Sequence, residues 1–240
     1  MNIEIEIYKR ISEAKKDEKT IEWKRKILNT KMELFGLYAK EVESIIKEFK
    51  SADFKELKKR NCFELNQIYL TINLIQMKNL AEQQLFLKNN TDIIDSWAIT
   101  DCTYQHLKIK KFEEAITFFD EFSNTNIEML IRYAYLALFK FKNCKEYLQD
   151  ILALFKDSSF YYVNMVEAWL LSFLYIAFPS EVYEYLRDST ISNEIKLKAI
   201  SKICDSFRVS DKDKNLVKQL RYNLRGIGVN LWTEEKKKNL

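Results

Sequence analysis

Hydrophobic side chains recur along this chain at the three- and four-residue spacing of amphipathic helices. In the stretch "AKEVESIIKEFK" (39–50), Val42, Ile45, Ile46 and Phe49 fall on one stripe, and charged residues cover the rest of the helix surface. The two longest apolar segments are rich in β-branched and aromatic residues, but they show neither the strict alternation of apolar and polar residues nor the turn chemistry of β-hairpins. The pattern therefore predicts an all-α protein.

The same spacing predicts a succession of helices of roughly 10 to 19 residues, joined by brief polar connections. The first runs through "TIEWKRKILNTKMELF" (20–35) toward Gly36, a residue that readily takes the left-handed conformation that ends a helix. Pro179 either stops the helix before it or opens the next one at its first turn. The other predicted helices cover 39–50, 62–77, 112–122, 127–141, 144–155, 160–178, 180–188, 193–207 and 211–224.

Helix pairs of about 35 to 45 residues, without an exact sequence repeat, favour an α-solenoid of HEAT-like type over its rival, a globular bundle. Three Gly and one Pro in 240 residues agree with an almost entirely helical chain, because sheet turns use these residues and helix interiors exclude them. The segments 126–142 and 160–178 are apolar nearly all round, so we expect them inside the stack. No linker rich in Pro or Ser divides the chain, which predicts one domain over residues 1–225 and a tail over 226–240.

The net charge of +4 permits a polyanionic partner but does not require one. Basic residues concentrate in four places, namely 22–26, 55–60, 108–111 and the span from Lys196 to Arg225. No apolar run approaches the length needed to cross a bilayer, and "MNIEIEIYKR" lacks the apolar core of a signal peptide. We therefore expect a cytoplasmic protein that does not enter the membrane.

Four widely spaced cysteines form no CxxC pair, and the chain has a single histidine. This composition predicts reduced thiols, with no metal site and no cofactor. Gly-rich phosphate loops, HExxH motifs and nucleophile elbows do not occur in the sequence. Hydrolysis by a catalytic triad, phosphoryl transfer and dinucleotide chemistry are therefore disfavoured.

Four residues on apolar helical segments remain as candidates for chemistry. Trp97 and Asp101 lie one helical turn apart in "SWAITDCTYQHLK" (96–108), Arg132 interrupts "EMLIRYAYLAL", and Trp169 lies within "YYVNMVEAWLLSFL". A charge on an apolar helix costs free energy unless it is paired, solvated or used.

Each candidate also has a structural interpretation. Asp101 can cap a helix that begins at Cys102, and Arg132 can extend its stem to solvent or pair with an acid such as Glu128. Trp97 and Trp169 can simply be large core side chains.

Taken together, these segments resemble the DNA alkylation repair family, the AlkD-type HEAT-like-repeat DNA glycosylases, in its short form. The resemblance rests on "IIDSWAITDCTYQHLK", "IEMLIRYAYLALF", "YYVNMVEAWLLSFLYIAFP" and "KAISKICDSFRVSDKDK". It is strongest from about Asn61 to Arg225, and weaker upstream around "LFGLYAKEVESIIKEFK".

The resemblance implies stacked helix pairs with a concave, basic face for duplex DNA. It also implies hydrolysis of the N-glycosidic bond of purines alkylated at N3 or N7, with the damaged base left stacked. Asp101 matches the catalytic aspartate, Trp97 and Trp169 match aromatics that pack against the deoxyribose, and Arg132 matches a basic residue near the backbone at the lesion. If the base stays stacked, we expect an open groove walled by Trp97, Asp101 and Trp169.

The chemistry agrees with this assignment. A cationic alkylpurine leaves without a general acid, so what must be stabilised is the developing oxocarbenium ion on the sugar. A carboxylate can stabilise that cation and orient the attacking water, and indole faces attract positive charge. Such a reaction needs neither a metal nor a histidine.

The sequence departs from the family pattern at three positions. Tyr38 and Ala39 replace the Arg and Pro expected near the first turn, and Ser172 stands one turn after Trp169 where a basic DNA contact is expected. Fewer phosphate contacts make DNA anchoring weaker and more sensitive to salt. Backbone contacts can come instead from Lys108, Lys110, Lys111, Lys202, Arg208, Lys212 and Lys214, each of which is by default a solvated surface charge.

The leading hypothesis is therefore a monomeric glycosylase acting on alkylated duplex DNA. Two others remain open, a non-catalytic member that binds duplex or branched DNA and a HEAT-like scaffold that binds protein.

Overall fold

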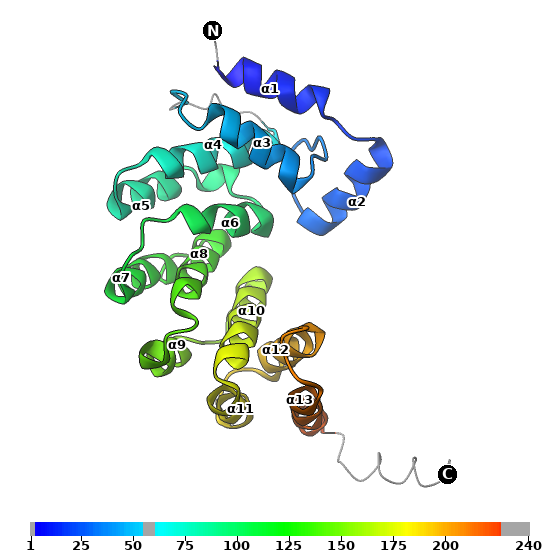
Figure 1. The fold of residues 1–240 in the computed structure, drawn as a ribbon, viewed down its shortest axis with the longest axis vertical. Helices are drawn as coiled ribbons and strands as arrows, with labels where there is room; N and C mark the ends of the chain where they lie inside the picture. The colour runs from blue at the N-terminus through cyan, green and yellow to red at the C-terminus, as the bar shows by residue number, and fades with distance from the viewer. Residues whose placement is uncertain (1–2, 55–60, 227–240) are drawn as a thin grey trace. The chain divides into compact units, whose positions relative to one another are not determined.

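The computed structural model describes residues 3–54 and 61–226, and these residues form thirteen α-helices and four short 3-10 helices with no strand (Figure 1). A single isolated bridge joins Glu33 and Cys62 in that part of the chain. The all-α prediction is confirmed, and the succession of helices that pack on their sequence neighbours is consistent with a helical-repeat protein. Within the described ranges, every helix is too short or too polar to cross a lipid bilayer.

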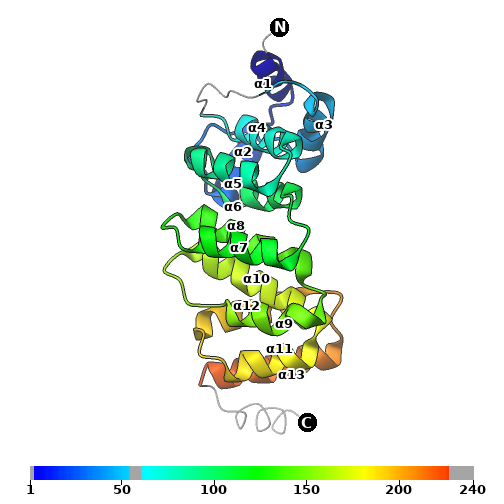
Figure 2. The ribbon, with the colours of Figure 1, turned by 90° about the vertical axis from the view of Figure 1, so that its left-hand side faces the viewer.

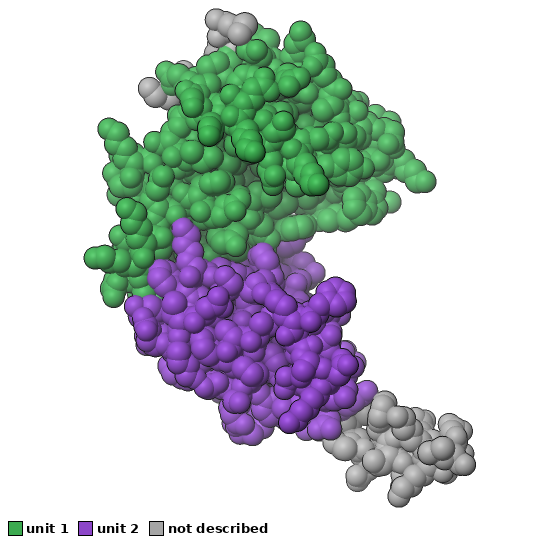
Figure 3. Space-filling model, viewed as in Figure 1, with its two compact units in different colours: residues 1–137 green, residues 138–240 purple. Residues whose placement is uncertain are grey.

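The chain divides into two compact units, residues 1–137 and 138–240 (Figure 3). The first unit contains α1 (Ile3–Glu13), α2 (Glu18–Leu28), α3 (Ala39–Phe49), α4 (Phe63–Gln76), α5 (Leu80–Asn89), η1 (Thr91–Ile93), α6 (Trp97–Thr103), η2 (Tyr104–His106), α7 (Phe112–Ser123) and all but the last residue of α8 (Glu128–Leu138). The second contains η3 (Phe139–Phe141), η4 (Lys145–Tyr147), α9 (Leu148–Ala153), α10 (Tyr161–Ala177), α11 (Pro179–Asp188), α12 (Asn193–Asp205) and α13 (Asp211–Leu224). The single domain proposed for residues 1–225 stays a prediction.

The first unit is built around α4. Every residue from Phe63 to Leu74 is buried, and the helix contacts α1, α3 and α6. Figure 1 shows α3 running beside α4, and Val42, Ile45 and Phe49 of α3 are buried as their spacing predicts. The packing of α6 against α4 fixes the position of α6, the helix that carries Trp97 and Asp101.

The connection between α2 and α3 corrects one prediction. We expected a helix through 20–35, but α2 ends at Leu28, where Asn29 takes the left-handed conformation with a φ of 51°. Gly36 is also left-handed, with a φ of 82°, but it lies in a turn whose backbone N–H groups all donate to the buried Glu64 carboxylate. Those bonds, from Phe35, Gly36 and Leu37, hold the segment in a non-helical shape.

The second unit is centred on α10 and α12, which pack against each other (Figure 2). The helix α10 also contacts α11, and α13 contacts both α11 and α12. Pro179 is the first residue of α11, so it opens that helix rather than continuing α10. Leu170, Leu171 and Leu174 of α10 are fully buried, as the apolar composition of this helix predicts.

Two helices of the first unit, α1 and α5, have no counterpart among the predicted segments. The basic cluster at 55–60 lies outside the described residues, as does the tail from residue 227 onward. The four cysteines are free, with Cys62 buried and the other three half-buried.

Candidate functional site

Ser96 fixes the start of α6. Its hydroxyl caps the helix by accepting from the N–H of Ala98 at 3.4 Å, and it donates to the carbonyl of Leu28 at 2.7 Å. Asp101 therefore lies in the second turn of α6 and does not cap a helix beginning at Cys102. The capping interpretation of Asp101 is wrong, because α6 already has its cap five residues earlier.

Trp97 is held against the end of α2. Its indole N–H donates to the carbonyl of Ile27 at 3.0 Å, and its ring is half-buried. Nearby, the Asp95 carboxylate accepts from the hydroxyl of Thr30 at 2.7 Å and from the N–H of Lys31 at 3.1 Å. The bond to Ile27 fixes one edge of the indole, and part of the ring stays in contact with solvent.

Arg132 of α8 binds Asp101 directly. Its Nε donates to Oδ1 of Asp101 at 3.0 Å, and its Nη2 donates to Oδ1 at 2.8 Å and to Oδ2 at 2.9 Å. The Arg132 Nε also lies 3.1 Å from the hydroxyl of Thr100. The ion-pair interpretation of Arg132 is thus confirmed, with Asp101 as the partner.

This pair is buried on the arginine side and open on the aspartate side. The exposed fraction of the Arg132 side chain is 5%, whereas that of Asp101 is 17%. A guanidinium that donates to both oxygens holds the carboxylate in one orientation. The arrangement leaves the Asp101 side chain in a fixed orientation and partly accessible from solvent, one helical turn from Trp97.

Three acidic groups near Asp101, the side chains of Cys102, Tyr104 and Tyr133, have raised pKa values that favour their neutral forms. Burial raises the pKa of the Cys102 thiol, and the negative charges of Asp101 and Glu43 raise it further. Burial and Asp101 likewise raise the pKa of Tyr104. Burial raises the pKa of Tyr133, whose hydroxyl bonds to Thr103 and which also feels the charge of Asp101. Cys102 is therefore a protonated thiol at neutral pH and is unsuited to nucleophilic catalysis.

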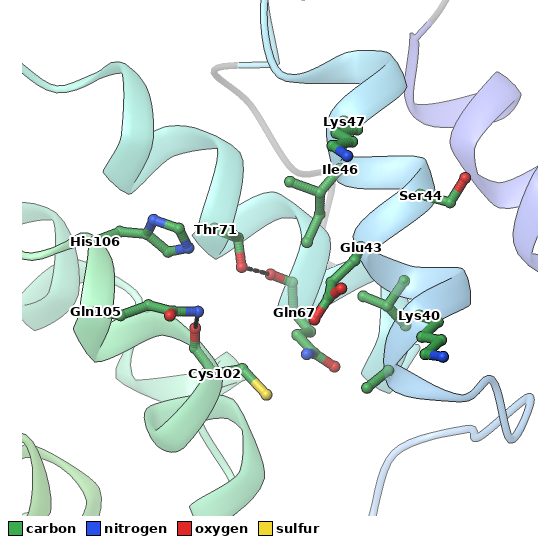
Figure 4. A pocket seen from close by; sticks show the side chains of 12 residues that line it. Lys40, Glu43, Ser44, Ile46, Lys47, Gln67, Thr71, Cys102, Gln105 and His106 are labelled. Carbon is green, nitrogen blue, oxygen red and sulfur yellow. Dashed lines mark hydrogen bonds between the residues drawn. The ribbon is translucent and has the colours of Figure 1, made fainter.

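A cleft of about 420 Å³ lies beside α6, between α3, α4 and the end of α6 itself (Figure 4). Its lining includes Lys40, Glu43, Gln67, Cys102, Gln105 and His106, and the Cys102 sulfur points into it. Trp97, Asp101 and Arg132 do not line this cleft. It is consequently separate from the carboxylate and offers no nucleobase pocket facing Asp101.

Trp169 belongs to an aromatic cluster in the second unit. Its ring centroid lies 4.7 Å from that of Phe139 and 5.8 Å from that of Phe173, and the latter two lie 5.5 Å apart. Trp169 and Phe173 are both half-buried. Sequence reasoning identified Trp169 but missed Phe173, although its position one turn later on the same face of α10 was a readable signal.

The remaining basic candidates are distributed over both units. Lys108 follows η2 in the first unit, and its N–H donates to the Gln83 side chain at 2.7 Å. In the second unit, Lys202 lies on α12, Arg208 lies in the connection that follows it, and Lys212 and Lys214 lie in the first turn of α13. The basic candidates that belong to the second unit therefore lie on or next to the α12–α13 connection.

Two of the departures from the family pattern have clear structural roles. Ser172 is 4% exposed and donates its hydroxyl to the carbonyl of Trp169 at 2.7 Å, so it bonds within its own helix. Tyr38 is 53% exposed at the start of α3, and the ammonium groups of Lys16 and Lys24 lie 5.2 and 4.5 Å from its ring centroid. Burial lowers the pKa of Lys24, and Lys16 pairs with Glu41.

Within residues 3–54 and 61–226, no group of three or more His, Cys, Asp or Glu side chains is placed to hold a metal ion. A family model described as DNA alkylation repair enzyme matches residues 11–207. The chain belongs to this family. A search of curated proteins finds no match.

Membership in the DNA alkylation repair enzyme family supports a role in the repair of alkylated DNA, and with it a DNA partner. The match begins at residue 11, so it includes the upstream part where the resemblance was weaker. It spans Trp97, Asp101, Arg132 and Trp169, the four residues singled out from the sequence. Arg208, Lys212 and Lys214 lie beyond its end.

Proposed function

We propose that this protein is a monomeric DNA glycosylase that hydrolyses the N-glycosidic bond of purines alkylated at N3 or N7 in duplex DNA. The observation that carries the proposal is the carboxylate of Asp101. It is oriented by two donor atoms of Arg132, remains accessible from solvent, and lies one turn from an indole whose position is also fixed.

The reaction needs an oriented negative charge more than a strong base. An alkylated purine is cationic and leaves with the electron pair of the N-glycosidic bond, so positive charge develops on the deoxyribose. Asp101 would stabilise this oxocarbenium ion and orient the water that attacks it. The half-buried ring of Trp97 would pack against the sugar and present an electron-rich face to the cation. The same role for Trp169, which belongs to the second unit, stays a prediction from the family resemblance.

Arg132 has a different role in this proposal from the backbone contact that the family resemblance implies. The residue is 4% exposed, and its guanidinium donates to Asp101 through Nε and Nη2. Leaving that partner for a phosphate would strand a carboxylate, which is costly in a partly buried site. We therefore assign Arg132 to positioning Asp101, and the backbone contact stays a prediction.

The proposal keeps the damaged base in the stack. Base-flipping enzymes bind the extruded base in a pocket next to the catalytic group. The cleft beside α6 is lined by Cys102 and not by Asp101, so it is not a pocket of that kind, and attack without extrusion stays a prediction from the family resemblance.

The test is release of 7-methylguanine and 3-methyladenine from methylated duplex DNA by the wild-type protein, measured by chromatography at low salt. The expected result is release of the free bases, with no release of unmodified guanine or adenine. No release of either methylated base at any enzyme concentration would contradict the proposal.

A second function is favoured by Ser172. Its buried hydroxyl bonds to its own helix at a position where the family pattern places a basic DNA contact. Weaker anchoring would suit a member that binds duplex or branched DNA without turnover. Salt-dependent binding to undamaged duplex, without release of methylated bases, would support this alternative.

A further inference from the structure

The connection between α12 and α13 contains a phenylalanine, Phe207, that is fully exposed to solvent. The exposed fraction of Phe207 is 102%, the highest among the exposed large hydrophobic residues of the described chain. Both neighbouring helix ends are well defined, because Ser206 closes α12 and Ser210 caps α13 by accepting from the N–H of Asp213 at 3.1 Å. An ordered connection thus presents an aromatic ring to solvent, where the ring contributes nothing to the packing of the described residues.

The next residue links this connection to the Trp169 cluster. The Arg208 guanidinium carbon lies 4.7 Å from the ring centroid of Phe173, the residue whose ring meets Trp169 edge-on. The ammonium of Lys142 lies 5.8 Å from the same ring. Trp169, Phe173 and Arg208 therefore lie side by side in the second unit, and Phe207 directly precedes Arg208 in the chain.

The flat face of the Arg208 guanidinium lies against the Phe173 ring, and its N–H donors remain available to a ligand. The guanidinium lies over the Phe173 ring, and the Arg208 backbone N–H donates to Ser206, but no hydrogen bond or ion pair of the guanidinium is found among the described residues. Stacking restricts the side chain without using its donors, so less rotational freedom is lost when it binds a planar or tetrahedral anion. Such a group is well suited to hold a phosphate.

Electrostatics alone does not make this connection a DNA contact. Lys202, Arg208, Lys212 and Lys214 alternate with Asp205, Asp211 and Asp213, so the local excess of positive charge is small. Phosphate binding here depends on the one preoriented guanidinium, and any further affinity has to come from Phe207. Aromatic rings bind nucleic acids by stacking on bases or by wedging between base steps, without regard to sequence.

We propose that Phe207 and Arg208 form a second DNA contact beside Trp169. In this contact Arg208 binds a backbone phosphate, and Phe207 presses on the base stack and partly unstacks a step next to the lesion. The inference rests on the proposed function for its DNA partner. The family match includes Phe207 as its last residue and ends before Arg208.

The experiment uses a duplex that carries an abasic-site analogue with 2-aminopurine as the neighbouring base, because 2-aminopurine brightens when it is unstacked. Binding of the full chain is followed by anisotropy and by 2-aminopurine fluorescence, for wild type, Phe207→Ala and Phe207→Trp. We expect wild type to brighten the probe, and Phe207→Ala to bind about tenfold more weakly and leave the probe dark. Phe207→Trp, which keeps an aromatic ring, should restore both signals.

The matched control is Tyr161→Ala. Tyr161 is also an exposed aromatic residue of the second unit, 56% exposed at the start of α10, with Lys198 over its ring. The Tyr161→Ala variant should bind the duplex and brighten 2-aminopurine as wild type does. Since Phe207 is fully exposed, thermal unfolding of Phe207→Ala should match that of wild type, so a loss of binding reports on the contact itself.

Three outcomes would overturn the inference. Equal binding and brightening by wild type and Phe207→Ala, with base release intact, would reject this contact and leave the proposed function standing. A lower mass of Phe207→Ala in light scattering, with unchanged DNA affinity, would assign Phe207 to self-association. A wild type that neither binds DNA nor releases methylated bases would reject the proposed function and this inference together.

Discussion

Arg132 in the first unit and Arg208 in the second lie in contrasting environments. Arg132 is 4% exposed and donates three hydrogen bonds to Asp101, whereas Arg208 is exposed and stacks on Phe173. Both are candidates for DNA contact from the sequence. Their surroundings separate them, because a buried guanidinium that already holds a carboxylate positions that group, and an exposed one with open donors can bind a phosphate.

The largest effect should come from removing the buried arginine. Arg132→Met leaves Asp101 without its partner, and we expect a loss of about 3–5 kcal/mol in the free energy of unfolding. Arg208→Met removes an exposed side chain and should change that free energy by less than about 0.5 kcal/mol. Urea unfolding followed by circular dichroism measures both, and equal losses would refute the distinction between the two arginines.

A smaller effect separates the two tryptophans. Trp97→Phe removes the indole N–H that donates to the carbonyl of Ile27, which should cost about 1 kcal/mol in the free energy of unfolding. Trp169→Phe keeps a ring against Phe139 and Phe173 and loses no hydrogen bond that the described residues make. The same urea titrations should therefore give Trp97→Phe a lower free energy of unfolding than Trp169→Phe. The reverse order would contradict the placement of the Trp97 ring.

The salt dependence of DNA binding should distinguish the arginines again. If Arg208 neutralises one phosphate, Arg208→Met should reduce the slope of log affinity against log salt by about 0.9. Tyr161→Ala should leave the slope unchanged, since Tyr161 carries no charge. Anisotropy titrations at several salt concentrations supply the slopes, and an unaltered slope for Arg208→Met would remove Arg208 from the DNA contact.

The smallest effect concerns the core of the first unit. Burial raises the pKa of the Cys62 thiol from 9.0 to about 12, so the thiol stays protonated at pH 8.5. Because the folded value lies above the unfolded one, Cys62 contributes stability below pH 9 that is lost as the pH rises toward about 12. Iodoacetamide labelling with peptide mass spectrometry should show Cys62 modified in urea and protected without it, and rapid labelling of the native protein would contradict its burial.

Helical spacing was sufficient to predict much of the fold. The ranges of α3, α4, α7, α10 and α13 agree with their predicted segments to within one residue at each end. The end of α2 was not readable, because Glu64 reaches the Phe35–Leu37 turn from a later helix. The helix α1 was missed because "IEIEIYKR" alternates like a strand, although Ile7 and Ile11 are buried one turn apart.

The site was readable only in part. Trp97 and Asp101 share a helix, so their spacing predicted a common face. The partner of Asp101 lies 31 residues later, on α8, and no local pattern connects the two. The stacking of Arg208 on Phe173 likewise joins a connection to a helix more than thirty residues earlier, and only tertiary packing reveals it.

The central claim is that the oriented carboxylate of Asp101 carries the reaction. The most direct test is single-turnover release of 7-methylguanine from methylated duplex DNA by wild type, Asp101→Asn and Asp120→Asn, with folding of each variant checked by circular dichroism. Asp120 is an exposed aspartate on α7 and serves as the matched control. We predict that Asp101→Asn slows release by roughly 10²–10³-fold while Asp120→Asn leaves it unchanged. Equal release by wild type and a folded Asp101→Asn would contradict the role assigned to Asp101.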